Sequence, residues 1–175
     1  MTVRVAYVAS DDKPNGANIN YQPGVVLNWN DFKGKPVDGS DAAAITSAGF
    51  GIKLSFKRFE RASELLIAVN CSFSKKNSWV KPNHKTSYIL NHEQRHFDVA
   101  YIHTMRFITR LQNAKFTATN YTSVIEKIYK ETAIEMAQMQ NEYDSESDHS
   151  RNAETQTEWN EKIAKILSSA SLVKK

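Results

Sequence analysis

Five consecutive residues, 92–96, have the types and the spacing that metal chemistry needs. They are His92, Glu93, Gln94, Arg95 and His96, the pattern H-E-x-x-H. In a helix, residues four apart lie on one face, so both imidazoles can bind one metal ion. Glu93 then lies beside that ion and can accept a proton from a metal-bound water. The motif predicts a zinc-dependent hydrolase, most simply a metallopeptidase that cleaves amide bonds.

The helix that carries this motif is predicted over residues 87–112, a stretch without glycine or proline. Its apolar side chains fall on two faces, with Val99 and Phe107 on one and Phe97 and Ile108 on the other. A helix that is apolar on two sides is buried on two sides, here between a sheet and a second helical layer. Because burying unpaired polar groups is costly, this context favours a functional site over a surface helix with solvated side chains.

Length and composition are those of one globular domain, predicted over residues 1–175. The chain is 41% hydrophobic and 24% charged, and its net charge of +4 comes from scattered lysines. It lacks the stripe of basic and aromatic residues that nucleic-acid binding requires, so the expected partner is a peptide or protein substrate. The single cysteine, Cys71, lies in an apolar strand pattern and is expected to be a core residue.

The sequence shows no targeting or membrane-spanning segment. No run of 18 apolar residues is present, so no membrane span is expected. Residues 1–7 lack the apolar core of a signal peptide. The chain either stays inside the cell or has lost a leader, and the sequence does not choose between the two.

The first half of the chain has the pattern of β-strands. Apolar and polar residues alternate clearly in residues 50–56 and 65–73, and more weakly in residues 3–7 and 25–29. The connection over residues 57–64 is short and charged, which predicts a hairpin between antiparallel neighbours. Alternation with a period of two predicts a sheet with one face on the core.

The second half has the pattern of helices. A second helix is predicted over residues 123–142 and a last one over residues 152–168, separated by a polar break at residues 143–150. Strands followed by helices predict an α+β fold, with an N-terminal antiparallel-type sheet and a helical C-terminal half. Together with the motif, this arrangement is zincin-like.

A catalytic zinc ion takes three protein ligands, so the motif needs a third residue. His103 lies on the same helix face, but about 10 Å along the axis beyond His96, too far to share the ion. It is predicted either to pack in the core or to contact a metal ligand without binding the metal itself. Glu142 is a second candidate, because residues 141–145 resemble the N-E-x-x-S segment of thermolysin-like enzymes.

His149 is the preferred third ligand. It lies in the predicted break between two helices, where a loop side chain can reach back to the motif. The acidic residues around it can orient imidazole N–H groups; they are Asp144, Glu146 and Asp148.

Three segments resemble an uncharacterised bacterial family described as predicted secreted zinc-dependent proteases. Residues 29–36 are similar to its W-x-D-F-x-G-x-P pattern, and residues 92–98 contain the H-E-x-x-H motif. Residues 143–150 are similar to Y-D-x-x-T-x-H-G, with Ser147 for Thr and Ser150 for Gly. The resemblance extends through Trp159 and implies a secreted or periplasmic location and His149 as the third ligand. The missing glycine at Ser150 affects the loop beside that ligand.

The predicted mechanism is zinc-assisted hydrolysis. His92, His96 and His149 hold Zn²⁺, Glu93 is the general base, and Tyr143 donates to the developing oxyanion. The substrate is expected to pair with an exposed sheet edge, for which residues 65–73 are the candidate. The alternatives are a catalytically inactive zincin-like binding or assembly module, and zinc-dependent hydrolysis of a non-peptide bond.

Overall fold

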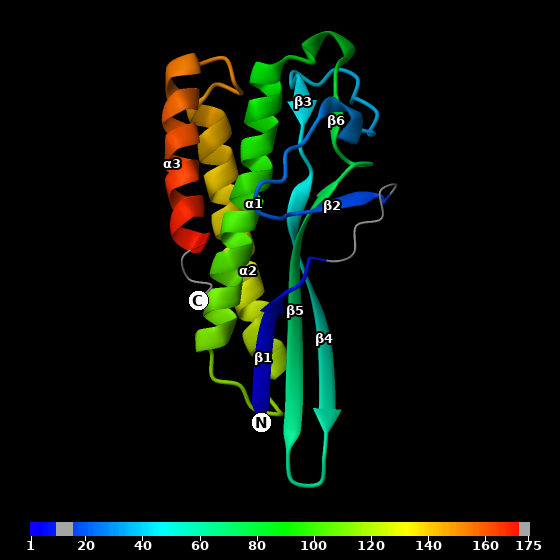
Figure 1. Ribbon diagram of the computed structural model, residues 1–175, viewed down its shortest axis with the longest axis vertical. Helices are drawn as coiled ribbons and strands as arrows, with labels where there is room; N and C mark the ends of the chain where they lie inside the picture. The colour runs from blue at the N-terminus through cyan, green and yellow to red at the C-terminus, as the bar shows by residue number, and fades with distance from the viewer. Residues whose placement is uncertain (10–15, 172–175) are drawn as a thin grey trace.

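A computed structural model describes residues 1–9 and 16–171 of the chain. Within this part, a sheet built from the first half of the chain lies on one side of the first of three C-terminal helices, and the last helix lies on the other side of it (Figure 1). The helices are α1 (Ser87–Asn113), α2 (Tyr121–Glu146) and α3 (Ala153–Ser171). The predicted α+β class is therefore confirmed. None of the helices described is both long and apolar enough to cross a membrane.

The main sheet is mixed rather than antiparallel. Its central strand is β5 (Ser63–Ser74), which pairs antiparallel with β4 (Ala48–Arg58) and β2 (Asn18–Asn20). The first strand, β1 (Thr2–Tyr7), lies parallel to β5, from the Thr2–Glu64 pair to the Tyr7–Val69 pair. The predicted antiparallel-type sheet is wrong in this strand, because alternation identifies a strand's faces and not its direction.

The predicted substrate-pairing edge at residues 65–73 is also wrong. These residues belong to β5, which has β1, β2 and β4 as partners and lies inside the sheet. A separate two-stranded sheet is formed by β3 (Ala44–Ile45) and β6 (Trp79–Val80). It lies beside the N-terminal half of α1 (Figure 1).

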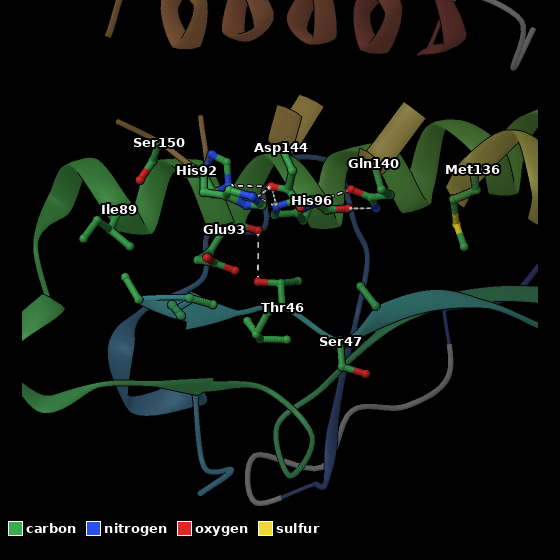
Figure 2. A pocket seen from close by; sticks show the side chains of 16 residues that line it. Thr46, Ser47, Ile89, His92, Glu93, His96, Met136, Gln140, Asp144 and Ser150 are labelled. Atoms are coloured by element: carbon green, nitrogen blue, oxygen red, sulfur yellow. Dashed lines mark hydrogen bonds and ion pairs between the residues drawn. The ribbon is translucent and has the colours of Figure 1, made fainter. Parts of the chain in front are cut away.

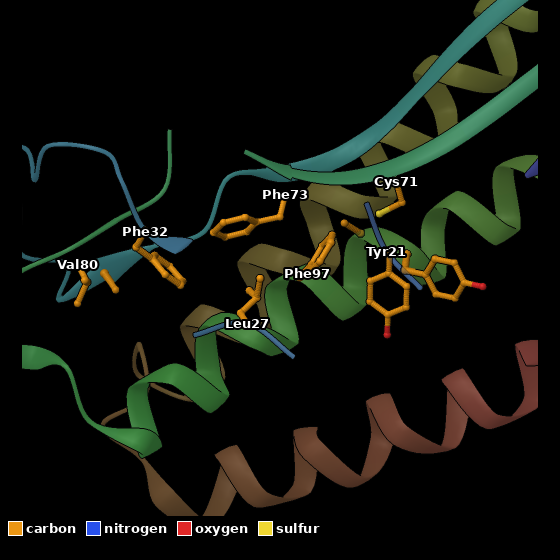
Figure 3. Close-up of a cluster of buried hydrophobic side chains, with 10 residues drawn as sticks. Tyr21, Leu27, Phe32, Cys71, Phe73, Val80 and Phe97 are labelled. Carbon is orange, nitrogen blue, oxygen red and sulfur yellow. The ribbon is translucent and has the colours of Figure 1, made fainter. Parts of the chain in front are cut away.

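The alternation in β5 places every second side chain in the core. Leu65, Ile67, Val69, Cys71 and Phe73 are fully buried. Burial raises the pKa of the Cys71 thiol to about 12, as expected for a core cysteine. Figure 3 shows one cluster of this core. In it, Phe97 of α1 lies among side chains from β5 and from residues 21–32, the N-terminal loop.

Residues 25–29 form no strand, contrary to the prediction. A short 3-10 helix, Trp29–Asp31, begins there instead, and Leu27 is buried against the core. The Asn28 side chain caps this helix by accepting from the Asn30 N–H, and the Asp31 carboxylate accepts from the Asn28 N–H. This reciprocal capping stabilises a helical turn at the point where alternation indicates extension.

The helix boundaries differ most at the end of α2. Helix α1 begins after Thr86, whose side chain accepts from the Ile89 N–H, and it matches the predicted residues 87–112 closely. Helix α2 runs to Glu146, whereas the prediction ended it at residue 142. Asp144 is therefore a helical residue and not part of a loop. Three residues with positive φ follow: Asp148, His149 and Ser150.

Candidate metal centre

Three side chains from two helices converge on one point. His92 and His96 lie one turn apart on α1, and their Nε2 atoms are 3.1 Å from each other. Asp144 of α2 places Oδ1 at 3.1 Å from the Nε2 of His92 and 3.0 Å from that of His96 (Figure 2). The three ligand atoms form a group that can hold a metal ion.

Two glutamines fix the orientation of the imidazoles. Gln140 donates its amide N–H to the backbone oxygen of His96, so its Oε1 faces the Nδ1 of the same histidine at 2.5 Å. Gln156 places Oε1 at 2.8 Å from the Nδ1 of His92. Since an amide oxygen only accepts, each Nδ1 carries the hydrogen and each neutral ring has its Nε2 lone pair free.

This arrangement fits a metal ion. Two Nε2 lone pairs and a carboxylate oxygen are acceptors, and acceptors 3.0–3.1 Å apart repel one another unless a cation or a proton lies between them. Ligands bound to zinc at roughly 2.0–2.1 Å with tetrahedral angles are themselves about 3.3 Å apart. The donor set, two imidazoles and a carboxylate, is one that zinc accepts.

The electrostatics of the group agree with this geometry. Burial lowers the pKa of His96, but the adjacent Asp144 and Glu93 carboxylates outweigh burial and leave that pKa above its ordinary value. Burial raises the pKa of Asp144, but its contacts with the His92 and His96 imidazoles outweigh burial and hold that pKa well below its usual range. The site therefore favours an ionised Asp144 and attracts positive charge.

Glu93 lies between this group and a cavity. It is only 3% exposed, and among the residues described its Oε2 atom has no hydrogen-bond partner. Thr46 donates to the backbone oxygen of Glu93, not to the side chain, which points into the cavity (Figure 2). A buried carboxylate oxygen without a hydrogen-bond partner is costly for the fold, so its retention favours a chemical role.

The cavity lies between helices α1 and α2 on one side and residues 42–48 on the other. Its volume is about 280 Å³. His92, Glu93, His96 and Asp144 all line it, so the metal group is open to a ligand on this side. A catalytic metal site requires such an open position.

His149 lies at the mouth of the cavity, outside the group of three. Its Nδ1 is 3.7 Å from the Oδ1 of Asp144, and its side chain is 61% exposed. It stands in a left-handed turn, with φ of 48° at Asp148, 50° at His149 and 72° at Ser150. A glycine is the favoured residue for such a φ, so Ser150 adds strain beside His149. A role of His149 as third ligand stays a prediction.

The other candidate ligands lie elsewhere. Glu142 is exposed on α2 and lines a separate hollow together with His103. His103 is fully buried, and its Nδ1 bonds to the backbone oxygen of Val99. Burial lowers its pKa, which suits a neutral packing residue.

Tyr143 is a buried support for His92. Its ring stacks on that imidazole with centroids 4.5 Å apart, and its hydroxyl donates to the backbone oxygen of His92 at 3.4 Å. The same hydroxyl accepts from Gln156 at 2.6 Å, and burial raises its pKa. These contacts position His92, whereas donation to an oxyanion stays a prediction.

Sequence reasoning did not identify Asp144 as a candidate ligand, nor Gln140 and Gln156 as the partners of the two imidazoles. The available signal was the spacing of Gln140 and Asp144, one turn apart as His92 and His96 are. If α2 had been predicted to extend to Glu146, Gln140 and Asp144 would have formed a polar pair on one face of that helix. The sequence would then have indicated that this pair faces His92 and His96 where the two helices pack.

One comparison with known proteins gives a match, and that match includes His92, His96 and Asp144. No significant match is found among curated proteins or among solved structures. Residues 68–150 match the model of a family described as "Bacterial protein of unknown function (DUF922)". The matched stretch contains most of β5, all of α1 and α2, and the turn with His149, so the chain is similar to that bacterial family over slightly less than half of its length.

Proposed function

We propose that this protein is a zinc-dependent metallopeptidase with a zincin-like site. His92, His96 and Asp144 hold the ion, and Glu93 acts as general base. One observation carries the proposal: three acceptor atoms converge within 3.1 Å beside a buried carboxylate oxygen that has no described partner. The same donor set also serves iron in oxygenases, but a buried glutamate beside the open position favours hydrolysis.

The chain's own residues supply the proton transfers. When bound, zinc lowers the pKa of a coordinated water and polarises the substrate carbonyl. Glu93 takes the proton as the water oxygen attacks the carbonyl carbon, and then gives it to the leaving amine as the C–N bond breaks. Gln140 and Gln156 hold the imidazoles, so neither ligand has to reorient during the reaction.

Asp144 is the third ligand in this proposal, because its Oδ1 already contacts both Nε2 atoms. The family resemblance favours His149, and that assignment stays a second proposal. A secreted or periplasmic location, which the resemblance also implies, is tested by fractionating the cells that produce the full-length protein.

An amide substrate is favoured by what lines the cavity. Within the described part of the chain, no lysine or arginine lines it. Enzymes that bind phosphate or carboxylate groups use such cations, which makes a phosphoester substrate less suitable. One edge of β3 is occupied by β6, next to which the Lys81 N–H donates to the Ala43 oxygen. Among the residues described, no strand pairs with the other edge of β3, so a peptide substrate can pair there.

Metal analysis and one isosteric variant test the proposal. The purified protein is expected to bind about one zinc ion per chain and to cleave peptides. Glu93→Gln should keep the zinc and lower kcat by about 10³-fold, since it removes the base and leaves the ligands. A zinc-loaded wild type that cleaves no member of a broad peptide library would instead favour the inactive binding or assembly module.

A further inference from the structure

Apart from the metal group, Glu93 and His149 at its mouth, the cavity is lined by residues without charged side chains. Its lining includes two acidic residues, Glu93 and Asp144, and both belong to the proposed catalytic group. A bound divalent cation balances these two charges. A charged substrate side chain would therefore enter this cavity without a partner and would lose its hydration there.

Small and apolar residues flank the group on both sides. Ile89 lies on α1 one turn before His92, and Met136 lies on α2 one turn before Gln140. Figure 2 shows these two side chains at opposite ends of the cavity, with the metal group between them. The facing wall over residues 42–48 contains four alanines. Both ends therefore offer apolar surface to a bound chain.

We propose that the substrate is an extended peptide with uncharged, apolar side chains on both sides of the cleaved bond. This inference rests on the proposed function. An extended chain rises about 3.3 Å per residue and turns alternate side chains to the same face. A peptide that lies along residues 42–48 with its scissile bond at the metal group can direct neighbouring side chains toward Ile89 and Met136.

Cleavage profiles of the zinc-loaded wild type give the first test. The probes are acetylated hexapeptide amides that differ only in the two residues flanking the scissile bond. Leucine or methionine at these positions is expected to give kcat/KM about 100-fold higher than aspartate or lysine, within the range that apolar pockets achieve. Equal cleavage of apolar and charged peptides, or a preference for charged ones, would overturn the inference.

Binding to the Glu93→Gln protein separates this inference from the hydrolase proposal. The same peptides, fluorescently labelled, are titrated with the zinc-loaded variant, which does not need to cleave them. Tighter binding of the apolar peptides supports the substrate class even if the wild type hydrolyses nothing. Binding without preference contradicts it, whatever the outcome of the hydrolysis assay.

A matched pair of variants on α2 tests whether the cavity end at Met136 causes the preference for apolar peptides. Met136→Lys places a cation at one end of the cavity and should lower the preference for apolar peptides at least tenfold, with a gain for acidic ones. Ile134→Lys is the control, because Ile134 is 59% exposed and does not line the cavity. Met136 also contacts the core, so circular dichroism must show that its variant is folded. Identical profiles for the folded variant and the wild type would contradict the inference, and Met136→Ala tests the same position if the lysine variant does not fold.

Discussion

Helix α1 carries a buried carboxylate on each of two faces, and the surroundings of the two differ. Asp98 accepts from the Tyr21 hydroxyl, from Gln94 and from Arg95, at 2.9, 3.0 and 2.6 Å. The Oε2 of Glu93 has no described partner, and the neighbouring Asp144 meets two imidazole acceptors.

The two carboxylates therefore differ in how far their hydrogen-bonding capacity is met by the described residues. On the Asp98 face, donors meet acceptors, and Gln94 also accepts from the Leu27 N–H, which ties the N-terminal loop to the helix. On the Glu93 face, acceptors meet acceptors, and the group of His92, His96 and Asp144 can hold a metal ion. The two x positions of H-E-x-x-H, Gln94 and Arg95, thus hydrogen-bond within the fold, while His92, Glu93 and His96 line the cavity of the candidate site.

The largest effect is expected from Asp144→Asn, which removes a charged ligand. Removing a residue that hydrogen-bonds to a metal ligand lowers metal affinity by roughly 10–100-fold, so removing a ligand itself should lower it by more than about 100-fold. Isothermal titration with zinc measures this loss. His149→Ala is the comparison variant and should keep zinc affinity within about threefold of wild type. The opposite ranking would make His149 the third ligand.

Asp98→Ala should affect stability rather than zinc binding. Removing one partner of a buried pair leaves Arg95 and the Tyr21 hydroxyl without their acceptor, at a cost of about 3 kcal/mol. Urea unfolding of the zinc-free protein measures this change. Zinc affinity of the folded variant should stay close to wild type, and a parallel loss of affinity would show that the two faces of α1 are not independent.

Gln140→Leu tests the orientation of His96. The ring loses the acceptor of its Nδ1–H, and zinc affinity is expected to fall by roughly 10–100-fold. Gln138→Leu, on the exposed side of the same helix, is the matched control. If both variants bind zinc equally well, Gln140 does not orient the ligand.

The smallest expected effect is the pH dependence of the zinc-free protein. Folding raises the pKa of His96. Its contribution to the free energy of unfolding is therefore fully present below about pH 6.5 and is lost as the pH rises through the pKa of His96 in the folded protein. Because the pKa of Asp144 is lowered, its contribution is present above about pH 3.9 and is lost as the pH falls.

The Tm of the metal-free protein should therefore be highest between about pH 4 and 6.5 and should decline as the pH rises further. Added zinc should reverse the decline, since binding requires neutral imidazoles. His96→Gln should remove the decline at high pH. A decline that persists in this variant would assign it to another group.

Local patterns predicted the elements that have strong local signals. The absence of glycine and proline predicted α1, and alternation predicted β4 and β5. The direction of β1 and the 3-10 helix at Trp29–Asp31 were not predicted, because strand direction is a long-range property and capping by Asn28 overrides alternation. The end of α2 was placed four residues early, which left Asp144 in a loop.

The sequence alone determined the arrangement of His92, Glu93 and His96, because the helical repeat fixes which side chains share a face. It also determined that their helix is buried. Only the tertiary structure decided what completes the group. Packing brings Asp144 of α2 to His92 and Gln140 to His96, so the two helices run antiparallel with their polar turns in register. No local pattern encodes that register, since it depends on how the apolar faces of both helices fit the same core.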